Sequence, residues 1–215
     1  MAMTRRRWLA DCSAALALAA AAAAMPAFAA ATRTILVVGD SLSAEYGLVR
    51  GTGWVALLEQ RIAREQIAAT VVNASISGDT TAGGLARLPA LLRERKPNVV
   101  VELGGNDALR GLPLEATRAN LVEMTKLAKA AGAKVVIVGM QLPPNYGRAY
   151  GDRFAALFAD VAKSEGAALV PFLLKGVADA ANAEAMFQPD RIHPLASAHP
   201  TMLANVWPVL APLLK

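Results

Sequence analysis

The sequence predicts an α/β fold built on a parallel sheet of about five strands. Two observations support this prediction. From Thr34 onward, short runs rich in β-branched residues alternate with longer segments of helical periodicity. The runs are also almost continuously apolar, as expected for strands that helices cover on both faces. Such alternation is typical of a parallel sheet in an α/β domain.

The expected elements alternate along the whole chain after the N-terminal segment. The strands are expected at Ile35–Val38, Thr70–Val72, Val99–Leu103, Val135–Val138 and Ala168–Pro171. The helices are expected at Trp54–Arg64, Thr81–Glu94, Glu115–Ala131, Arg153–Glu165 and Leu195–Leu214. Gly132 and Gly166 stand where glycine commonly ends a helix. No repeat or linker indicates a second domain, so residues 30–215 are expected to form one.

Residues 1–29 are predicted to be a cleaved export signal. Arg5–Arg7 precede the apolar run Leu9–Ala24, and Ala27–Ala29 provide a small-residue cleavage pattern. A membrane anchor is the alternative, but the run is mostly alanine, which partitions weakly into lipid. Thr4–Leu9 also resembles a twin-arginine signal, so Sec and Tat export both stay open. The protein is therefore expected to be periplasmic or secreted.

Composition excludes several classes of protein. The 215 residues are 55% hydrophobic and 18% charged, which argues against a disordered chain. The net charge of +5 raises the question of a nucleic-acid partner, but without residues 1–29 it falls to +3, with 19 basic and 16 acidic residues. One cysteine and two histidines exclude an intrachain disulfide and a Cys-rich or His-rich metal site. We expect no metal, no cofactor, no nucleic acid, no membrane span in the mature chain, and by default a monomer.

Polar segments follow four of the expected strands. In open parallel sheets, ligands bind beyond the carboxyl ends of the strands. Any one of these segments is an ordinary turn by composition, but together they predict a site at one edge of the sheet. They are Gly39–Ser43, Asn73–Asp79, Gly104–Asp107 and Gln141–Tyr146.

The two histidines narrow the search for a general base. His193 follows Asp190 at Asp-x-x-His spacing, between Pro189 and Pro194, so the carboxylate can reach Nδ1 and leave Nε2 for a serine. By itself this spacing favours a surface histidine beside a turn-forming aspartate. His199 has no nearby carboxylate and is expected to be a surface or partly packed histidine.

Ser41 is the preferred nucleophile because it stands where a strand meets the following turn. Gly39 would permit a sharp bend there, and Asp40 is expected to bond backbone amides in the turn. Weaker serine candidates are Ser43, Ser75 and Ser77. The sequence contains no G-x-S-x-G elbow, so the α/β-hydrolase signature is missing.

An oxyanion hole needs two or three donors aimed at one point. The backbone N–H groups of Ser41 and Gly78 and the side-chain amide of Asn106 each follow a different strand. They are therefore the expected donors.

These segments resemble the SGNH (GDSL) hydrolase superfamily. Gly39–Ser43 is similar to its first block, Gly78 to its second, Gly104-x-Asn106-Asp107 to its third, and Asp190-x-x-His193 to its fifth. The resemblance covers essentially all of residues 34–212 and is strongest to the bacterial periplasmic thioesterase I, lysophospholipase and arylesterase branch.

The resemblance implies a flavodoxin-like three-layer α/β/α sandwich that needs no metal or organic cofactor. It implies Ser41 as nucleophile, His193 as general base and then acid, and Asp190 as the group that orients His193. Ser41, Gly78 and Asn106 would line the oxyanion hole.

The resemblance also implies acyl esters and thioesters as substrates. The residues expected to flank the acyl groove are Leu109, Leu112, Leu114, Leu142, Pro143 and Tyr146. Arg191 departs from the family pattern, because many relatives carry a small residue there; it would either favour anionic head groups or point to solvent.

Two other functions stay open at this stage. One is a carbohydrate O-acetylesterase on the same scaffold, although the leucines of the expected groove favour acyl chains over sugar. The other is a non-catalytic ligand-binding domain.

Overall fold

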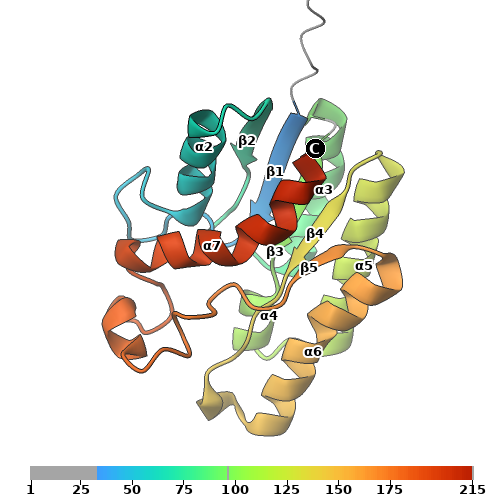
Figure 1. Cartoon of the computed structure of the whole chain (residues 1–215). Coiled ribbons are helices and arrows are strands. Elements are labelled where there is room, and N and C mark those ends of the chain that lie inside the picture. Colours follow the sequence, from blue (N-terminus) through green and yellow to red (C-terminus); the bar gives the residue numbers. More distant parts are fainter. Residues whose placement is uncertain (1–32, 96, 215) are drawn as a thin grey trace, which may run out of the picture. The chain divides into compact units, whose positions relative to one another are not determined.

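A computed structural model describes residues 33–95 and 97–214 of the chain. The predicted export signal, residues 1–29, lies outside the described residues. Five strands form one parallel sheet in the order β2-β1-β3-β4-β5 (Figure 1). Their bounds are β1 Arg33–Gly39, β2 Ala69–Asn73, β3 Asn98–Glu102, β4 Val135–Val138 and β5 Ala168–Val170. This is the strand order of the flavodoxin-like doubly wound fold, so the predicted fold class is confirmed.

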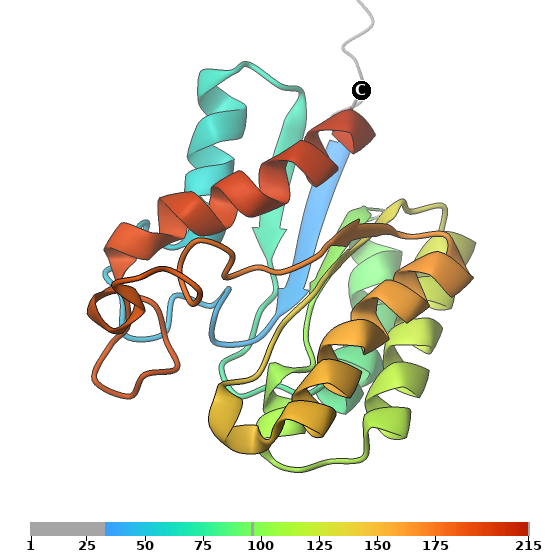
Figure 2. The same cartoon turned by 60° about the horizontal axis from the view of Figure 1, so that its bottom comes forward.

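Helices cover both faces of the sheet (Figures 1 and 2). On one face α2 packs against α7, and on the other α3, α5 and α6 pack side by side. Their bounds are α2 Trp54–Arg64, α3 Thr81–Arg95, α5 Leu114–Ala130, α6 Arg148–Glu165 and α7 His199–Leu210. The result is the three-layer arrangement that the sequence predicts.

The interior strand β1, which lies between β2 and β3, explains why the expected strands are so continuously apolar. Ile35, Leu36, Val37 and Val38 are all fully buried, although alternate side chains point to opposite faces of the sheet. Each such side chain contributes roughly 1.5–3 kcal/mol when it leaves water. A polar residue on either face would therefore lie in the core.

The structure differs from the prediction mainly in the short helices. The helix α4, Gly105–Leu109, was not predicted, and α6 begins at Arg148 rather than Arg153. Gly151 weakens the first turn of α6 by about 1 kcal/mol, but the buried Phe154 and Phe158 hold the helix on the sheet. The last predicted helix, Leu195–Leu214, divides into α7 and the flanking 3₁₀ turns Ala196–Ala198 and Ala211–Leu214. Gly132 and Gly166 both adopt the left-handed conformation after their helices, as predicted.

A long irregular segment joins β5 to α7 and passes beyond the carboxyl ends of the strands (Figure 2). Its two arms pair through a bridge between Phe187 and Pro194, and the Leu195 N–H donates to the Met186 carbonyl at 2.8 Å. This segment brings the chain around residue 190 next to the turn that follows β1. Within the described residues, no helix is long and apolar enough to cross a membrane.

Candidate active site

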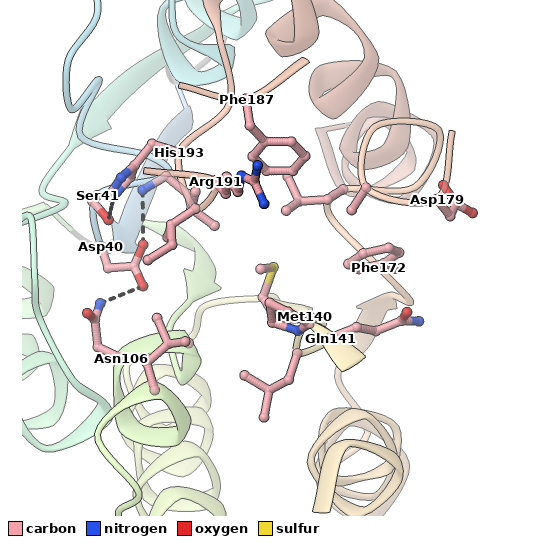
Figure 3. A pocket seen from close by; sticks show the side chains of 18 residues that line it. Asp40, Ser41, Asn106, Met140, Gln141, Phe172, Asp179, Phe187, Arg191 and His193 are labelled. Atoms are coloured by element: carbon pink, nitrogen blue, oxygen red, sulfur yellow. Dashed lines mark hydrogen bonds between the residues drawn. The ribbon is translucent and has the colours of Figure 1, made fainter. Parts of the chain in front are cut away.

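Ser41, His193 and Asp190 form a continuous hydrogen-bonded chain. The Ser41 Oγ lies 2.8 Å from His193 Nε2 (Figure 3), and His193 Nδ1 lies 2.6 Å from Asp190 Oδ2. A carboxylate only accepts, so His193 donates from Nδ1 and accepts the Ser41 hydroxyl at Nε2. A serine, a base and an orienting carboxylate thus have the mutual geometry of an activated nucleophile.

Asp190 is held as an anion by hydrogen bonds from its own loop. Its Oδ1 accepts the backbone N–H groups of Ile192 at 2.9 Å and His193 at 3.0 Å. Partial desolvation acts to raise the pKa of Asp190, but the bonds from the His193 backbone, the His193 ring and Ile192 together lower the pKa to about 2. Asp190 therefore stays ionised throughout the neutral range.

The loop that holds Asp190 and His193 is fastened to the turn after β1. The Gln188 N–H donates to the His193 carbonyl at 2.8 Å, and Gln188 Nε2 donates to the Tyr46 carbonyl at 2.9 Å. The Tyr46 ring lies against the His193 ring, with centroids 4.4 Å apart. Sequence reasoning missed Gln188 and Tyr46, because neither stands in a polar segment after a strand.

The turn that presents Ser41 is stabilised by Asp40. Its Oδ1 accepts the Leu42 N–H at 3.0 Å, which confirms the predicted bond to a backbone amide of the turn. The prediction that Gly39 provides conformational freedom for a bend is wrong, since Gly39 ends β1 without a positive φ. Glycine is needed there for space: a Cβ would lie 2.7 Å from Glu102 Oε2 and 2.9 Å from Ser43 Oγ.

Glu102, which the sequence analysis did not single out, lies fully buried beneath this turn. Its Oε2 accepts the Ser43 hydroxyl at 2.7 Å and the Asp40 N–H at 3.3 Å. Burial raises the pKa of Glu102 well above its usual range, and the neighbouring Asp40 charge raises it further. Burial also raises the pKa of Asp40 to about 6, although bonds from Leu42 and Asn106 and the charge of His193 oppose it. The signal was available: Glu102 is a lone charge at the end of an apolar strand.

Two of the three expected oxyanion donors lie on the wall of a cavity, Ser41 and Asn106. Asn106 lies in the first turn of α4, and its Nδ2 donates to Asp40 Oδ2 at 3.0 Å. Gly78 has a φ of +79° and does not line this cavity. Its carbonyl accepts a bond of 2.6 Å from Arg110 Nη2, which fixes the loop after β2.

The candidate serine Ser43 and the second histidine, His199, both have structural surroundings unlike those of Ser41 and His193. Ser43 is buried and accepts the Trp54 indole N–H at 3.1 Å while it donates to Glu102. His199 is also buried, and its Nδ1 accepts the Trp54 backbone N–H at 2.9 Å. The prediction of a surface or partly packed histidine is therefore wrong. His199, the first residue of α7, has a structural role, since it accepts the N–H of the first residue of α2. Burial lowers the pKa of His199.

A cavity of about 430 Å³ opens beside Ser41 and Asn106. Of the six residues expected to flank an acyl groove, Leu109, Leu142 and Pro143 line it. The other three do not: Leu114 is buried in the core, and Leu112 and Tyr146 lie exposed outside the lining. Apolar residues that the sequence analysis missed complete the wall: Met140, Phe172, Leu174, Ala178, Phe187 and Ile192.

These missed residues follow β4 and β5 or precede His193. The rule that ligands bind beyond strand ends could have identified those after β4 and β5, since both strands end at this edge. Arg191 also lines the cavity, with a φ of +58°. Its side chain is 79% exposed and its Nη2 lies 3.7 Å from Glu184 Oε1. Within the described part of the chain, no group of three or more His, Cys, Asp or Glu side chains could hold a metal ion.

The known proteins to which this chain is similar are all named as hydrolases of related kinds. The model of the GDSL-like lipase/acylhydrolase family matches residues 37–199. The chain is 56% identical over 186 residues to esterase TesA of Pseudomonas aeruginosa, covering 86% of this chain and 91% of that protein. It is 42% identical over 188 residues to thioesterase 1/protease 1/lysophospholipase L1 of Escherichia coli K12, covering 87% and 88%. It is also 42% identical over 171 residues to an arylesterase of Vibrio mimicus, covering 79% and 84%.

Solved structures agree with these relatives. The crystal structure of TesA superposes with a TM-score of 0.81 at 55% identity, covering 84% of this chain and 99% of the other. The psychrotrophic esterase EstA from Pseudoalteromonas sp., inhibited by monoethylphosphonate, gives a TM-score of 0.79 at 37% identity, covering 85% and 98%.

Proposed function

The chain belongs to the GDSL-like lipase/acylhydrolase family and is a carboxylic ester hydrolase, and we propose that Ser41, His193 and Asp190 are its catalytic residues. The observation that supports the assignment is the unbroken chain of bonds from Ser41 Oγ through His193 to Asp190, with Ser41 and His193 on the wall of an apolar cavity. Nucleophile, base and orienting group then lie beside a space where an acyl group fits.

Acylation begins when the Ser41 Oγ attacks the ester carbonyl and His193 Nε2 takes its proton. Asp190 stabilises the imidazolium that forms and keeps its ring oriented. The N–H groups of Ser41 and the Asn106 side chain, both on the cavity wall, stabilise the oxyanion, and the Gly78 N–H, from outside the lining, is the expected third donor. Each such donor is worth on the order of 10²–10³ in kcat. His193 then protonates the leaving alcohol or thiol, and an acyl-Ser41 ester remains.

Deacylation repeats these steps with water as the nucleophile. Water attacks the acyl-Ser41 carbonyl while His193 Nε2 takes a proton from it. The same donors stabilise the oxyanion of this second tetrahedral intermediate. Collapse of this intermediate returns the proton to Ser41 Oγ and releases the carboxylic acid. These side chains and water account for every proton and acyl transfer in the two steps.

The substrates are esters and thioesters of acyl chains, as in the relatives named esterase, thioesterase, lysophospholipase and arylesterase. The cavity beside Ser41 supports this class over carbohydrate O-acetyl esters. Its wall includes Met140, Leu142 and Phe172, which would contact several methylene groups rather than the hydroxyls of a sugar. An octanoyl ester should therefore be hydrolysed with a higher kcat/KM than the matching acetyl ester.

Labelling with a fluorophosphonate tests the nucleophile. We expect covalent modification of Ser41 in the wild-type protein and none in Ser41→Ala, which should also lose turnover of a p-nitrophenyl ester. Ser77→Ala is a matched control, since it removes a hydroxyl from a neighbouring strand-end loop and should label normally. Labelling of Ser41→Ala would refute Ser41 as the nucleophile, and a folded wild-type protein that does not label would favour the ligand-binding alternative.

Residues 1–29 are proposed to direct export to the periplasm or the medium, with cleavage before Ala30. N-terminal sequencing of the protein recovered outside the cytoplasm tests this, and a start at Met1 would contradict it. We also propose that the mature protein is a monomer, which sedimentation of the purified enzyme checks.

A further inference from the structure

The Asn106 side chain owes its orientation to one buried carboxylate. Resting on the proposed function, we propose that Asp40 is a positioning residue, whose carboxylate orients the Asn106 amide so that one N–H remains aimed at the oxyanion. Asp40 stands next to the nucleophile in sequence, but the mechanism above gives it no role. Figure 3 shows its carboxylate between the Ser41 turn and Asn106.

The bond between the two side chains fixes which end of the amide faces Asp40. Asn106 Nδ2 lies 3.0 Å from Asp40 Oδ2. An ionised carboxylate only accepts hydrogen bonds, so the NH₂ group and not the carbonyl oxygen must face it. One of the two Nδ2 hydrogens is used in this bond, and the other is available to an oxyanion. A flipped amide would present its oxygen instead, which repels an oxyanion.

Asp40 is itself held rigidly, so it can impose this orientation. Its side chain is buried, Oδ1 accepts the Leu42 N–H at 3.0 Å, and its own N–H donates to Glu102 Oε2 at 3.3 Å. One carboxylate thus joins the turn after β1, which presents Ser41, to α4, which presents Asn106. Asp40 thereby fixes the position of Ser41 relative to Asn106, although these two residues follow different strands.

Although burial raises the pKa of Asp40 to about 6, Asp40 is still mostly ionised at neutral pH. The titratable groups that face it are His193, Asp79 and Glu102. Burial raises the pKa of Glu102 and so favours its neutral form, and Arg87 pairs with Asp79 at 2.8 Å. When His193 becomes an imidazolium during acylation, its charge favours the ionised form of Asp40. The Asn106 bond is then charge-assisted and roughly twice as strong as a neutral one.

A double-mutant cycle tests whether Asp40 acts through Asn106. An amide at position 40 can accept from Leu42 or from Asn106 but not from both, so Asp40→Asn frees Asn106 to flip. We expect Asp40→Asn to lower kcat about 10- to 100-fold with KM changed by less than about threefold, because an oxyanion donor acts in the transition state. In the Asn106→Ala background the same substitution should change kcat by no more than about threefold.

Additive losses would overturn the proposal, as would a loss of less than about threefold in Asn106→Ala alone. Ser43→Ala is the matched control: it cuts a bond to Glu102 in the same turn without touching Asn106, so its effect should be additive with Asn106→Ala. Fluorophosphonate labelling separates this result from the proposed function: absence of labelling at Ser41 in the parent enzyme would refute the proposed function, whereas failure of the Asp40 proposal leaves that labelling unchanged.

A measurement without any change at position 40 covers the case in which Asp40→Asn does not fold. In His193→Ala, which removes the neighbouring titration, the NMR resonances of the Asn106 NH₂ group should shift with a midpoint near the Asp40 pKa of about 6. The resonances are assigned by their loss in Asn106→Ala. An NH₂ signal that does not shift between about pH 4.5 and 7.5 would overturn the proposal, because a bonded carboxylate must report its titration there.

Discussion

Two aspartates on either side of Ser41 have opposite pKa shifts. Asp190 lies in the loop before α7, where three hydrogen bonds lower its pKa to about 2. Asp40 lies in the turn after β1, and burial raises its pKa to about 6. Both accept hydrogen bonds at both oxygens, so bonding alone does not explain the difference. Where water still reaches the carboxylate the bonds decide the shift, and where it does not, desolvation decides it.

The two aspartates support the nucleophile in different ways. The loop before α7 holds Asp190 as the anion that stabilises the imidazolium of His193. The turn after β1, with Glu102 below it, fixes the positions of Ser41 and Asn106 at a cost in stability, since a buried carboxylate is expensive to ionise. Substitutions in the loop should therefore change turnover most, and substitutions in the turn should also change how stability depends on pH.

The largest effect is expected for Asp190→Asn. The amide cannot hold the Nδ1–H tautomer of His193 as a carboxylate does, so kcat should fall by on the order of 10³–10⁴. Steady-state turnover of a p-nitrophenyl ester measures this, with circular dichroism to show that the fold is retained. A loss below about tenfold would mean that the 2.6 Å bond to His193 has no catalytic role.

The next effect is the pH dependence of stability. Asp40 ionises near its usual value of 3.8 when unfolded and at about 6 when folded, so the folded state binds this proton more tightly between these values. The free energy of unfolding should therefore fall as the pH rises from about 4 to about 6, by roughly 1.4 kcal/mol per pH unit for this group. Urea titrations across this range measure the slope.

Two substitutions separate the buried groups in that slope. Glu102 acts in the same direction, because burial also raises its folded-state pKa. Asp40→Asn should remove only its own share between pH 4 and 6, and Glu102→Gln should remove the share of Glu102. Asp190 acts in the opposite sense, since its lowered pKa makes stability fall as the pH decreases from about 4 towards 2. An unchanged slope in Asp40→Asn would contradict the assigned shift.

The same two regions show what the sequence could predict. Asp190 and His193 are three residues apart, so their spacing showed that the bond was possible, although by itself it favoured a surface histidine. Glu102 lies 62 residues from Asp40 and Asn106 lies 66 residues from it, so only the register of β1 on β3 brings them together. That register pairs Gly39 with Glu102, and no local pattern specifies it.

The strands were predictable for a related reason. A strand buried on both faces must be apolar throughout, so β1 is visible in its own residues, whereas a cavity wall is assembled from several segments. The family resemblance implied that the apolar Leu112 and Leu114, in the loop after Asn106, flank the groove. The structure instead turns Leu114 into the core and leaves Leu112 at the surface. Phe172 and Leu174, which are 66 and 68 residues after Asn106, line the cavity wall instead.

A bulky residue on the cavity wall should shift chain-length preference. Ala178 lines the cavity on the segment after β5, so Ala178→Trp should exclude the end of an octanoyl chain and leave room for an acetyl group. Each methylene is worth about 0.8 kcal/mol, so losing two or three should lower the octanoyl-to-acetyl ratio of kcat/KM about 10- to 50-fold. Leu112→Trp is the matched control, and its ratio should stay within about twofold. A lower ratio in Leu112→Trp but not in Ala178→Trp would instead support the groove that was expected from the sequence.

The smallest effect is expected for Arg191, whose backbone φ of +58° is strained for any residue with a Cβ. Arg191→Gly should be about 1 kcal/mol more stable than Arg191→Ala, because both remove the guanidinium but only glycine relieves the backbone. Thermal unfolding of the pair measures the difference, and equal stabilities would place the strain elsewhere.

The same pair of variants decides between the two readings of the Arg191 side chain. It is 79% exposed and lies 3.7 Å from Glu184, so its charge is screened and partly balanced. We therefore expect it to point to solvent, with KM for a neutral and an anionic ester of equal chain length changed by less than about twofold in both variants. A rise in KM of more than about fivefold for the anionic ester alone would instead show that Arg191 recognises the head group, because only then does the lost charge matter to binding.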